Sequence, residues 1–117
     1  MLNIENLPDS EETQDELEDV VMGLIINSGG ARSLAYDALA KAKAGDFETA
    51  TKLMADSRQS LNEAHMVQTR LIENDQGEGS NVSLVLVHAQ DHLMTSMLAR
   101  ELVSELIELH RRLELKI

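Results

Sequence analysis

Apolar residues recur every three or four positions along three long stretches of this chain, and this spacing constrains its fold more than any other feature. The spacing places apolar side chains along one face of an α-helix, where they can be buried against other helices. It predicts helices at about residues 15–43, 47–73 and 82–114. We therefore expect an all-α subunit in which three helices form an antiparallel bundle.

Residues typical of turns separate the three stretches and support this division. Gly45 and Asp46 provide a glycine that can end one helix and an acid that can cap the next. Residues 74–81 are rich in Asn, Gly and acidic residues and are predicted to form a flexible loop. Within the first helix, Gly29 and Gly30 each cost about 1 kcal/mol relative to alanine. This pair predicts either a kink in the helix or a place where another part of the backbone comes close, and we favour the close approach.

The composition agrees with a small helical domain in a reducing compartment. The chain has 117 residues, no Cys and no Trp, with one Tyr and one Phe, so aliphatic packing must provide the core. The lack of cysteine excludes disulfides and cysteine-based zinc sites. No stretch resembles a signal peptide or a membrane span, and a cytoplasmic location is expected.

Negative charge is concentrated near the N-terminus. The formal net charge is −11, and the first 19 positions hold many acidic residues but no Lys or Arg. We expect residues 1–14 to form a disordered acidic tail and residues 15–117 to form the single folded domain. So acidic a chain is not expected to bind nucleic acid or anionic membranes, whereas a basic protein partner fits its charge.

The third predicted helix carries more apolar surface than a three-helix bundle can bury. This surplus predicts self-association through that helix. Much of this surface lies in a single row of residues along the helix. Asp91 is the only charged residue in that row, so in a buried interface it must be protonated, paired or bound to a metal. If the row lies on a symmetry axis, copies of Asp91 can share a divalent cation. We call the row the leucine seam: Leu84, Val87, Asp91, Met94, Leu98, Leu102, Leu106, Leu109 and Leu113.

Polar side chains interrupt the same helix at His88, Gln90, Asp91 and His92. The two histidines are four residues apart and share one face of the helix, and Asp91 lies three residues after His88. Three interpretations remain open: His88 is a nucleophile that takes up a phosphoryl group, the histidines bind a metal such as zinc, or they are hydrogen-bonded within the core. The chain lacks a Gly-rich phosphate-binding loop and a Ser or Cys nucleophile with a placed base, so ordinary hydrolase chemistry is not expected.

Several segments together resemble one protein family. They are residues 88–95 (HAQDHLMT), 28–33 (SGGARS), 45–47 (GDF) and 63–69, which contain Glu-Ala-His and Gln-Thr. Over about residues 17–113, the chain resembles the enzyme IIA component of the lactose, cellobiose and chitobiose family of the bacterial sugar phosphotransferase system. Gly30 stands where a larger polar residue is expected in this family.

This resemblance implies a homotrimer of three-helix subunits. It implies that His88 accepts a phosphoryl group from the histidine phosphocarrier protein and passes it to a cysteine of the sugar-specific IIB component, during uptake of a disaccharide such as chitobiose or cellobiose. By the same resemblance, Asp91 lies on the threefold axis and helps to bind a divalent metal, magnesium. Gln90, His92 or a residue of a neighbouring subunit then donates hydrogen bonds to the phosphoryl oxygens. The alternative function is a non-enzymatic helical adaptor or metal-binding bundle that uses His88, Asp91 and His92.

Overall fold

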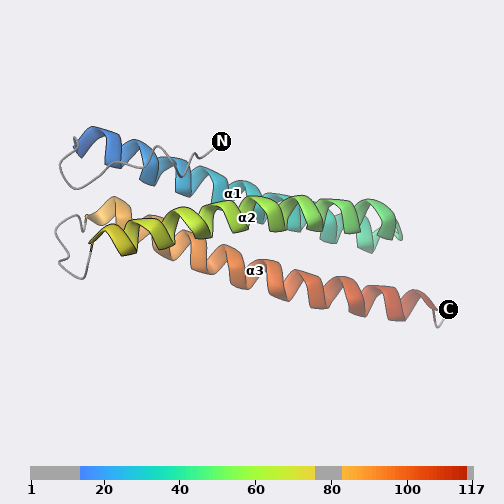
Figure 1. Cartoon of the computed structure of the whole chain (residues 1–117). Helices are drawn as coiled ribbons and strands as arrows, with labels where there is room; N and C mark the ends of the chain where they lie inside the picture. The colour runs from blue at the N-terminus through green and yellow to red at the C-terminus, as the bar shows by residue number, and fades with distance from the viewer. Residues whose placement is uncertain (1–13, 76–82, 116–117) are drawn as a thin grey trace.

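The computed structural model describes residues 14–75 and 83–115, which form three long α-helices (Figure 1). They are α1 (Gln14–Lys43), α2 (Phe47–Asp75) and α3 (Leu84–Leu115). Successive helices run in opposite directions in a slender bundle with extents of 61 × 21 × 18 Å. The all-α class is confirmed, and each predicted helix boundary lies within about two residues of the observed one.

Two predictions concern segments that lie largely outside the described residues. The predicted acidic tail at 1–14 reaches the structure only at Gln14, the first residue of α1. Of the predicted loop at 74–81, the first two positions belong instead to the end of α2, and the others are not described. Across the two described ranges, no helix is long and apolar enough to cross a membrane.

A tight turn at Gly45 reverses the chain between α1 and α2. Gly45 has a φ of 85°, in the left-handed region that glycine adopts without strain. The amide of Asp46 donates to the carbonyl of Lys41 at 2.9 Å and closes the end of α1. The Asp46 carboxylate then accepts from the Thr49 amide at 3.1 Å and caps α2, as predicted. Hydrogen bonds from the side chain and backbone of Thr49 hold the pKa of Asp46 below its usual value.

An N-cap that the apolar spacing does not indicate begins α3. The Leu86 amide donates to the Ser83 hydroxyl at 3.1 Å, and the Val87 amide donates to the Ser83 carbonyl at 3.0 Å. Ser83 is therefore the N-cap, and the helix starts at Leu84 rather than at residue 82. This cap fixes the turn of α3 on which His88 lies.

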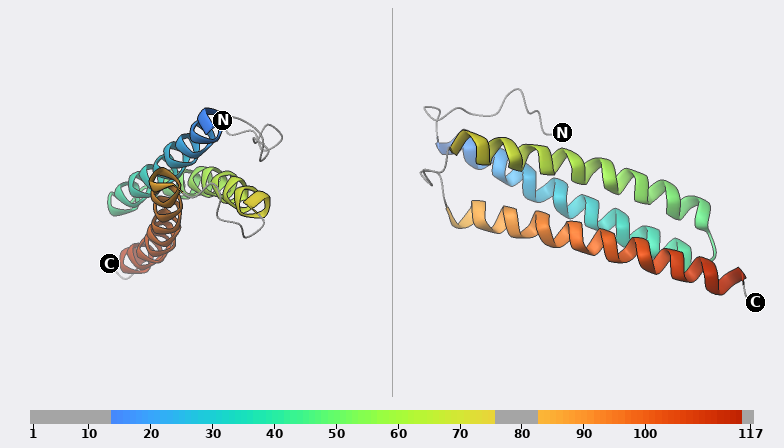
Figure 2. Two further views of the ribbon diagram at one scale, coloured as in Figure 1. Left: turned by 90° about the vertical axis from the view of Figure 1, so that its left-hand side faces the viewer. Right: turned by 60° about the horizontal axis from the view of Figure 1, so that its bottom comes forward.

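Small side chains fill the contacts that α1 makes with the other two helices. α1 lies between α2 and α3 and packs extensively against both, whereas α2 and α3 touch each other less (Figure 2). Because the side chains at these contacts are small, the helices approach closely. The small buried side chains are Ser28, Ala31, Ala35, Ala38 and Ala42 on α1, Ala50, Ser57 and Ala64 on α2, and Ala89 and Ser96 on α3, and they lie beside larger buried residues such as Leu24, Leu61 and Leu93.

Two hydrogen bonds from side chains to main-chain carbonyls fix the register of α1 and α2. The Ser57 hydroxyl donates to the Ala31 carbonyl at 2.6 Å. The Asn27 side-chain amide donates to the Ser60 carbonyl at 2.6 Å. Both bonds reach the backbone of the facing helix, which is possible only where the two helices are close together.

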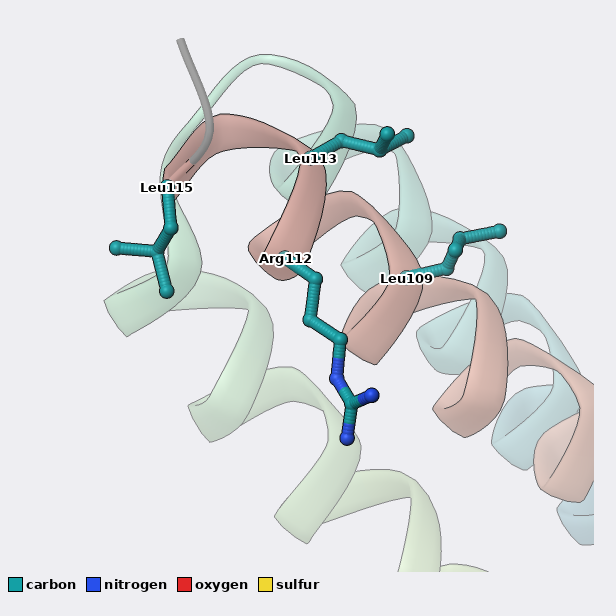
Figure 3. A pocket seen from close by; sticks show the side chains of 4 residues that line it. All are labelled: Leu109, Arg112, Leu113 and Leu115. Atoms are coloured by element: carbon teal, nitrogen blue, oxygen red, sulfur yellow. The ribbon is translucent and has the colours of Figure 1, made fainter.

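The leucine seam occupies the face of α3 opposite the buried residues, and it is exposed along its whole length. Leu84 is 86% exposed, and every other apolar member of the seam is at least 42% exposed. Near the C-terminal end, Leu109 and Leu113 project from one side of α3 and line an apolar pocket with Arg112 and Leu115 (Figure 3). The surplus of apolar surface predicted for this helix is therefore present on the single subunit.

Two buried serines test the contribution of the bond between α1 and α2. Ser57 and Ser28 are both fully buried, but the hydroxyl of Ser28 has no hydrogen-bond partner among the described residues. Both alanine substitutions give the same gain in helix propensity, and only Ser57→Ala removes a hydrogen bond. We expect Ser57→Ala to be less stable than Ser28→Ala by about 1 kcal/mol in free energy of unfolding. Urea unfolding followed by circular dichroism measures the difference, and equal stability of the two variants would contradict it.

Candidate active site

The four polar residues singled out in the sequence lie together near the start of α3. His88 and Asp91 are exposed, whereas Gln90 and His92 are partly buried. The imidazole rings of His88 and His92 stack, with centroids 5.9 Å apart and planes inclined by 8°. Because His88 is exposed, the interpretation of this residue as a core histidine is wrong. Its ring is accessible to a reacting partner.

The helix separates Gln90 from His88 within one subunit. Residues two apart on a helix point to nearly opposite sides, so the Gln90 side chain does not share the face of the His88 ring. Asp91 lies on the side adjacent to His88, within the exposed leucine seam. A hydrogen bond from Gln90 to a group on His88 therefore requires Gln90 of a neighbouring subunit.

The main chain of α1 forms a wall beside His92. A Cβ atom on Gly29 would lie only 3.1 Å from Nε2 and 3.9 Å from Cε1 of His92. The close approach expected at the glycine pair is therefore present at Gly29, but the group that approaches is an imidazole ring and not another backbone. A Cβ atom on Gly30 would meet nothing within 4 Å, so the expectation of close packing is wrong for this second glycine.

Arg32 lies one turn after Gly29 on α1, and its charge acts on His92. Burial lowers the pKa of His92, the charges of Arg32 and His88 lower it further, and Asp91 raises it. His92 is therefore more completely neutral at pH 7 than a free histidine, and a neutral imidazole has one N–H donor and one lone pair. Arg32 carries no signal of this role in the sequence, because no pattern along the chain brings it next to His92.

The described residues of one subunit do not form a complete metal site. No three His, Asp or Glu side chains in residues 14–75 and 83–115 gather as potential ligands of one ion. Two histidines that chelate an ion must aim a nitrogen of each ring at one point, and stacked parallel rings do not. Asp91 offers one exposed carboxylate, which fits a shared metal only if other copies of the chain bring theirs to the same point.

Two exposed apolar side chains of α1 lie on the turns before Gly29, on the side of the histidine pair. Gly29 of α1 lies beside His92 of α3, and the two helices run in the same direction. The turn that precedes Gly29 on α1 therefore lies beside the turn that precedes His92 on α3, which carries His88. An exposed apolar surface beside a reactive group is suited to docking another protein. We call these side chains the apolar rim: Met22 and Ile26, which are 46% and 70% exposed.

The lowered pKa of His92 gives a measurable pH dependence. An NMR titration of the His92 ring should give a pKa below 6.5, and Arg32→Gln should raise it because one of the charges that lower it is removed. The pKa of His92 is lower in the folded chain than in the unfolded chain. The contribution of neutral His92 to the free energy of unfolding is therefore fully present above about pH 6.5, and it is lost as the pH falls through the folded pKa. Arg70→Gln is the control, because Arg70 is an exposed arginine on α2, and it should leave the pKa of His92 unchanged. A His92 pKa at or above 6.5 would contradict this account.

Known proteins with a similar sequence or structure fall into one group. Residues 19–111 match the family model described as "PTS system, Lactose/Cellobiose specific IIA subunit", where PTS denotes the phosphotransferase system. The chain is 67% identical over 115 residues to the N,N'-diacetylchitobiose-specific EIIA component of the PTS of Escherichia coli K12, covering 97% of this chain and 99% of that protein.

Solved structures agree with the sequence comparison. A chain from the IIA(Chitobiose)–HPr complex of Escherichia coli is similar with a TM-score of 0.76 at 67% identity, covering 88% of this chain and 98% of that chain. The cellobiose-specific enzyme IIA from Bacillus anthracis is similar with a TM-score of 0.82 at 41% identity, covering 92% of this chain and 98% of that chain.

Proposed function

Because this chain belongs to the lactose/cellobiose-specific IIA family of the phosphotransferase system, we propose that it is a phosphocarrier in which His88 holds the phosphoryl group. It accepts this group from the histidine phosphocarrier protein (HPr) and passes it to a cysteine of the sugar-specific IIB component. The observation that carries the proposal is the exposed ring of His88, stacked on His92 and bordered by the apolar rim.

Each transfer exchanges one bond to phosphorus for another. A neutral ring nitrogen of His88 attacks the phosphorus of phosphorylated HPr, and the electron pair of the broken N–P bond returns to the donor histidine. In the second transfer a cysteine thiolate attacks, an S–P bond forms and His88 is regenerated. Such transfers pass through a loose, in-line transition state, so the protein contributes mainly positioning and charge stabilisation.

His92 is suited to stabilise the transferred group. Its ring lies parallel to that of His88 and one helical turn away. Its lowered pKa keeps it neutral near pH 7, with one N–H to donate to a phosphoryl oxygen. Arg32 adds positive charge on the α1 side of the pair. Gln90 contributes only if a neighbouring subunit presents it.

The apolar rim explains how two partners can use one histidine. Each partner must bring its reactive group to the same atom, so both dock over the same surface. A relay also requires complexes that form and dissociate rapidly, which suits a small interface. The related Escherichia coli IIA protein forms a complex with HPr, and 67% identity supports the same partner for this chain.

Sequence identity favours a chitobiose-type disaccharide as the transported sugar. The chain is 67% identical to a chitobiose-specific protein and 41% identical to a cellobiose-specific one. In the proposed relay the sugar does not touch this chain, so no residue of the site selects it.

We further propose that three copies associate through the leucine seam, with Asp91 at the axis. The exposed seam supports this, because leaving apolar area in water costs about 25 cal/mol per Å². Three carboxylates that converge on one axis repel each other unless a cation lies between them, and their oxygens are the ligands that magnesium prefers. The three copies of Asp91 would hold this metal, which would neutralise their charge inside the interface.

The alternative, a non-enzymatic adaptor or metal-binding bundle, fits the site less well. It explains neither the exposure of His88 nor the parallel stacking of the two rings, which does not suit chelation. The outcome of phosphorylation separates the two functions directly.

Phosphorylation of the purified chain tests the proposed carrier. Incubation with phosphoenolpyruvate, enzyme I and HPr should add one acid-labile phosphoryl group, visible by intact-mass spectrometry. His88→Ala should abolish the gain, because it removes the attacking nitrogen. His65→Ala is the matched control, since His65 is also an exposed histidine, on α2, and should leave the gain unchanged. Full phosphorylation of His88→Ala would reject the proposal, and tight zinc binding without phosphorylation would select the alternative.

Substitutions on two helices test the proposed assembly. Leu98→Asp places a charge in the seam and should dissociate the trimer while leaving the subunit helical, because Leu98 is 56% exposed on the single subunit. Ile72→Asp on α2 is the control, since Ile72 is 54% exposed and lies outside the seam. Sedimentation velocity measures the mass of each variant.

The same assembly should respond to magnesium through Asp91. Chelation with EDTA should lower the thermal midpoint of the native chain, and Asp91→Asn should remove this dependence because the convergent charges are gone. A native chain that sediments as a monomer, or one unaffected by chelation, would contradict the assembly or the metal respectively.

A further inference from the structure

Two adjacent glycines of α1 differ in what surrounds them. A Cβ atom on Gly29 would lie 3.1 Å from Nε2 of His92, whereas a Cβ atom on Gly30 would meet nothing within 4 Å. Among the described glycines only Gly45 has a positive φ, so the backbone conformation of α1 does not require glycine at either position. Gly29 is therefore distinguished by its contact with His92 alone.

We propose that Gly29 is a positioning residue for phosphoryl transfer on His88. Its missing side chain lets the ring of His92 lie against α1, parallel to the ring of His88. The inference rests on the proposed function of His88, and it assigns a role to a residue that has no reactive group of its own.

The main chain of α3 cannot move away to make room for a side chain at Gly29. Ala89 and Leu93, on the buried side of the same turns, are fully buried in the core cluster shared by the three helices. A shift of α3 would open that core, and close-packed interiors resist such gaps. A methyl group at Gly29 therefore displaces the His92 ring, by a few tenths of an ångström, rather than the helix.

The displaced ring loses its relation to His88. The His92 carbonyl accepts from the Thr95 hydroxyl at 3.2 Å and stays in the regular helix, so the ring can yield only by rotating about its side-chain bonds. The planes of the two rings are inclined by only 8° in the native chain, and rotation of the His92 ring away from α1 increases this angle. This change of direction should weaken the hydrogen bond that we propose from the N–H of His92 to a phosphoryl oxygen on His88.

Matched substitutions at the two glycines test the proposal. We would measure single-turnover transfer from phosphorylated HPr to the full chain carrying Gly29→Ala, Gly29→Val, Gly30→Ala or Gly30→Val. Gly29→Ala should slow transfer about tenfold and Gly29→Val about a hundredfold, because a larger group displaces the donor further. Both Gly30 variants should transfer at the native rate, and Gly30→Ala should raise the thermal midpoint through its better helix propensity.

A double-mutant cycle separates positioning from a purely structural effect. In a His92→Ala background the contact is gone, so adding Gly29→Ala should slow transfer no further. NMR of the native chain should also show contacts between the rings of His88 and His92 that weaken in Gly29→Ala. Transfer at the native rate by Gly29→Ala, or an equal loss in both backgrounds, would overturn the proposal. If Gly29→Ala fails to fold, the contact at Gly29 is required by the fold rather than by the orientation of the His92 ring, and the positioning role is wrong.

Failure of this inference is distinguishable from failure of the proposed function. If His88→Ala still takes up the phosphoryl group, the carrier proposal itself is wrong. If phosphorylation depends on His88 but the Gly29 variants transfer normally, only the positioning role is wrong.

Discussion

The close packing of α1 against both other helices determines the position of every group in the site. Its buried face consists largely of serine and alanine, including Ser28, Ala31 and Ala35, all with at most 1% exposed. Side chains of this size bring the helix axes close together. This proximity lets the Ser57 hydroxyl reach a main-chain carbonyl of α1 at 2.6 Å, and it brings the ring of His92 against the backbone at Gly29. A core of larger residues would hold α1 too far away for either contact.

The sequence was sufficient to predict the helices and the leucine seam, because both depend on local spacing. Apolar periodicity placed all three helices within about two residues, and the excess of apolar positions on α3 correctly indicated an exposed face. The start of α3 was placed too early, at residue 82. The apolar run begins at Val82, so the apolar spacing alone does not show that the helix starts after Ser83. Only the hydrogen bonds that Ser83 accepts show that it caps the helix. A cap is a geometric feature that the type of residue suggests but does not determine.

Part of the candidate site follows from the spacing of residues along α3, and the rest depends on how α1 packs against that helix. His88 and His92 could be paired from the sequence because residues four apart share a helix face, and the structure stacks them. Gly29 and Arg32 join them only through the packing of α1, more than 50 residues away in the chain. The glycine pair signalled a close approach, but no sequence pattern distinguishes the glycine that contacts His92 from its neighbour, which faces open space.

The circumference of α3 explains how assembly and phosphoryl transfer can coexist on one helix. Leu93 and its buried neighbours face the core, the leucine seam faces the opposite way, and the ring of His92 lies on the flank that meets α1. His88, one turn before His92, therefore lies on this flank as well and beside the seam rather than within it. In the proposed trimer, a neighbouring subunit that covers the seam would approach His88 from one side, while α1 borders it from the other. His88 would then lie in a recess whose far wall belongs to another copy, and that copy would be the one to bring Gln90 to it.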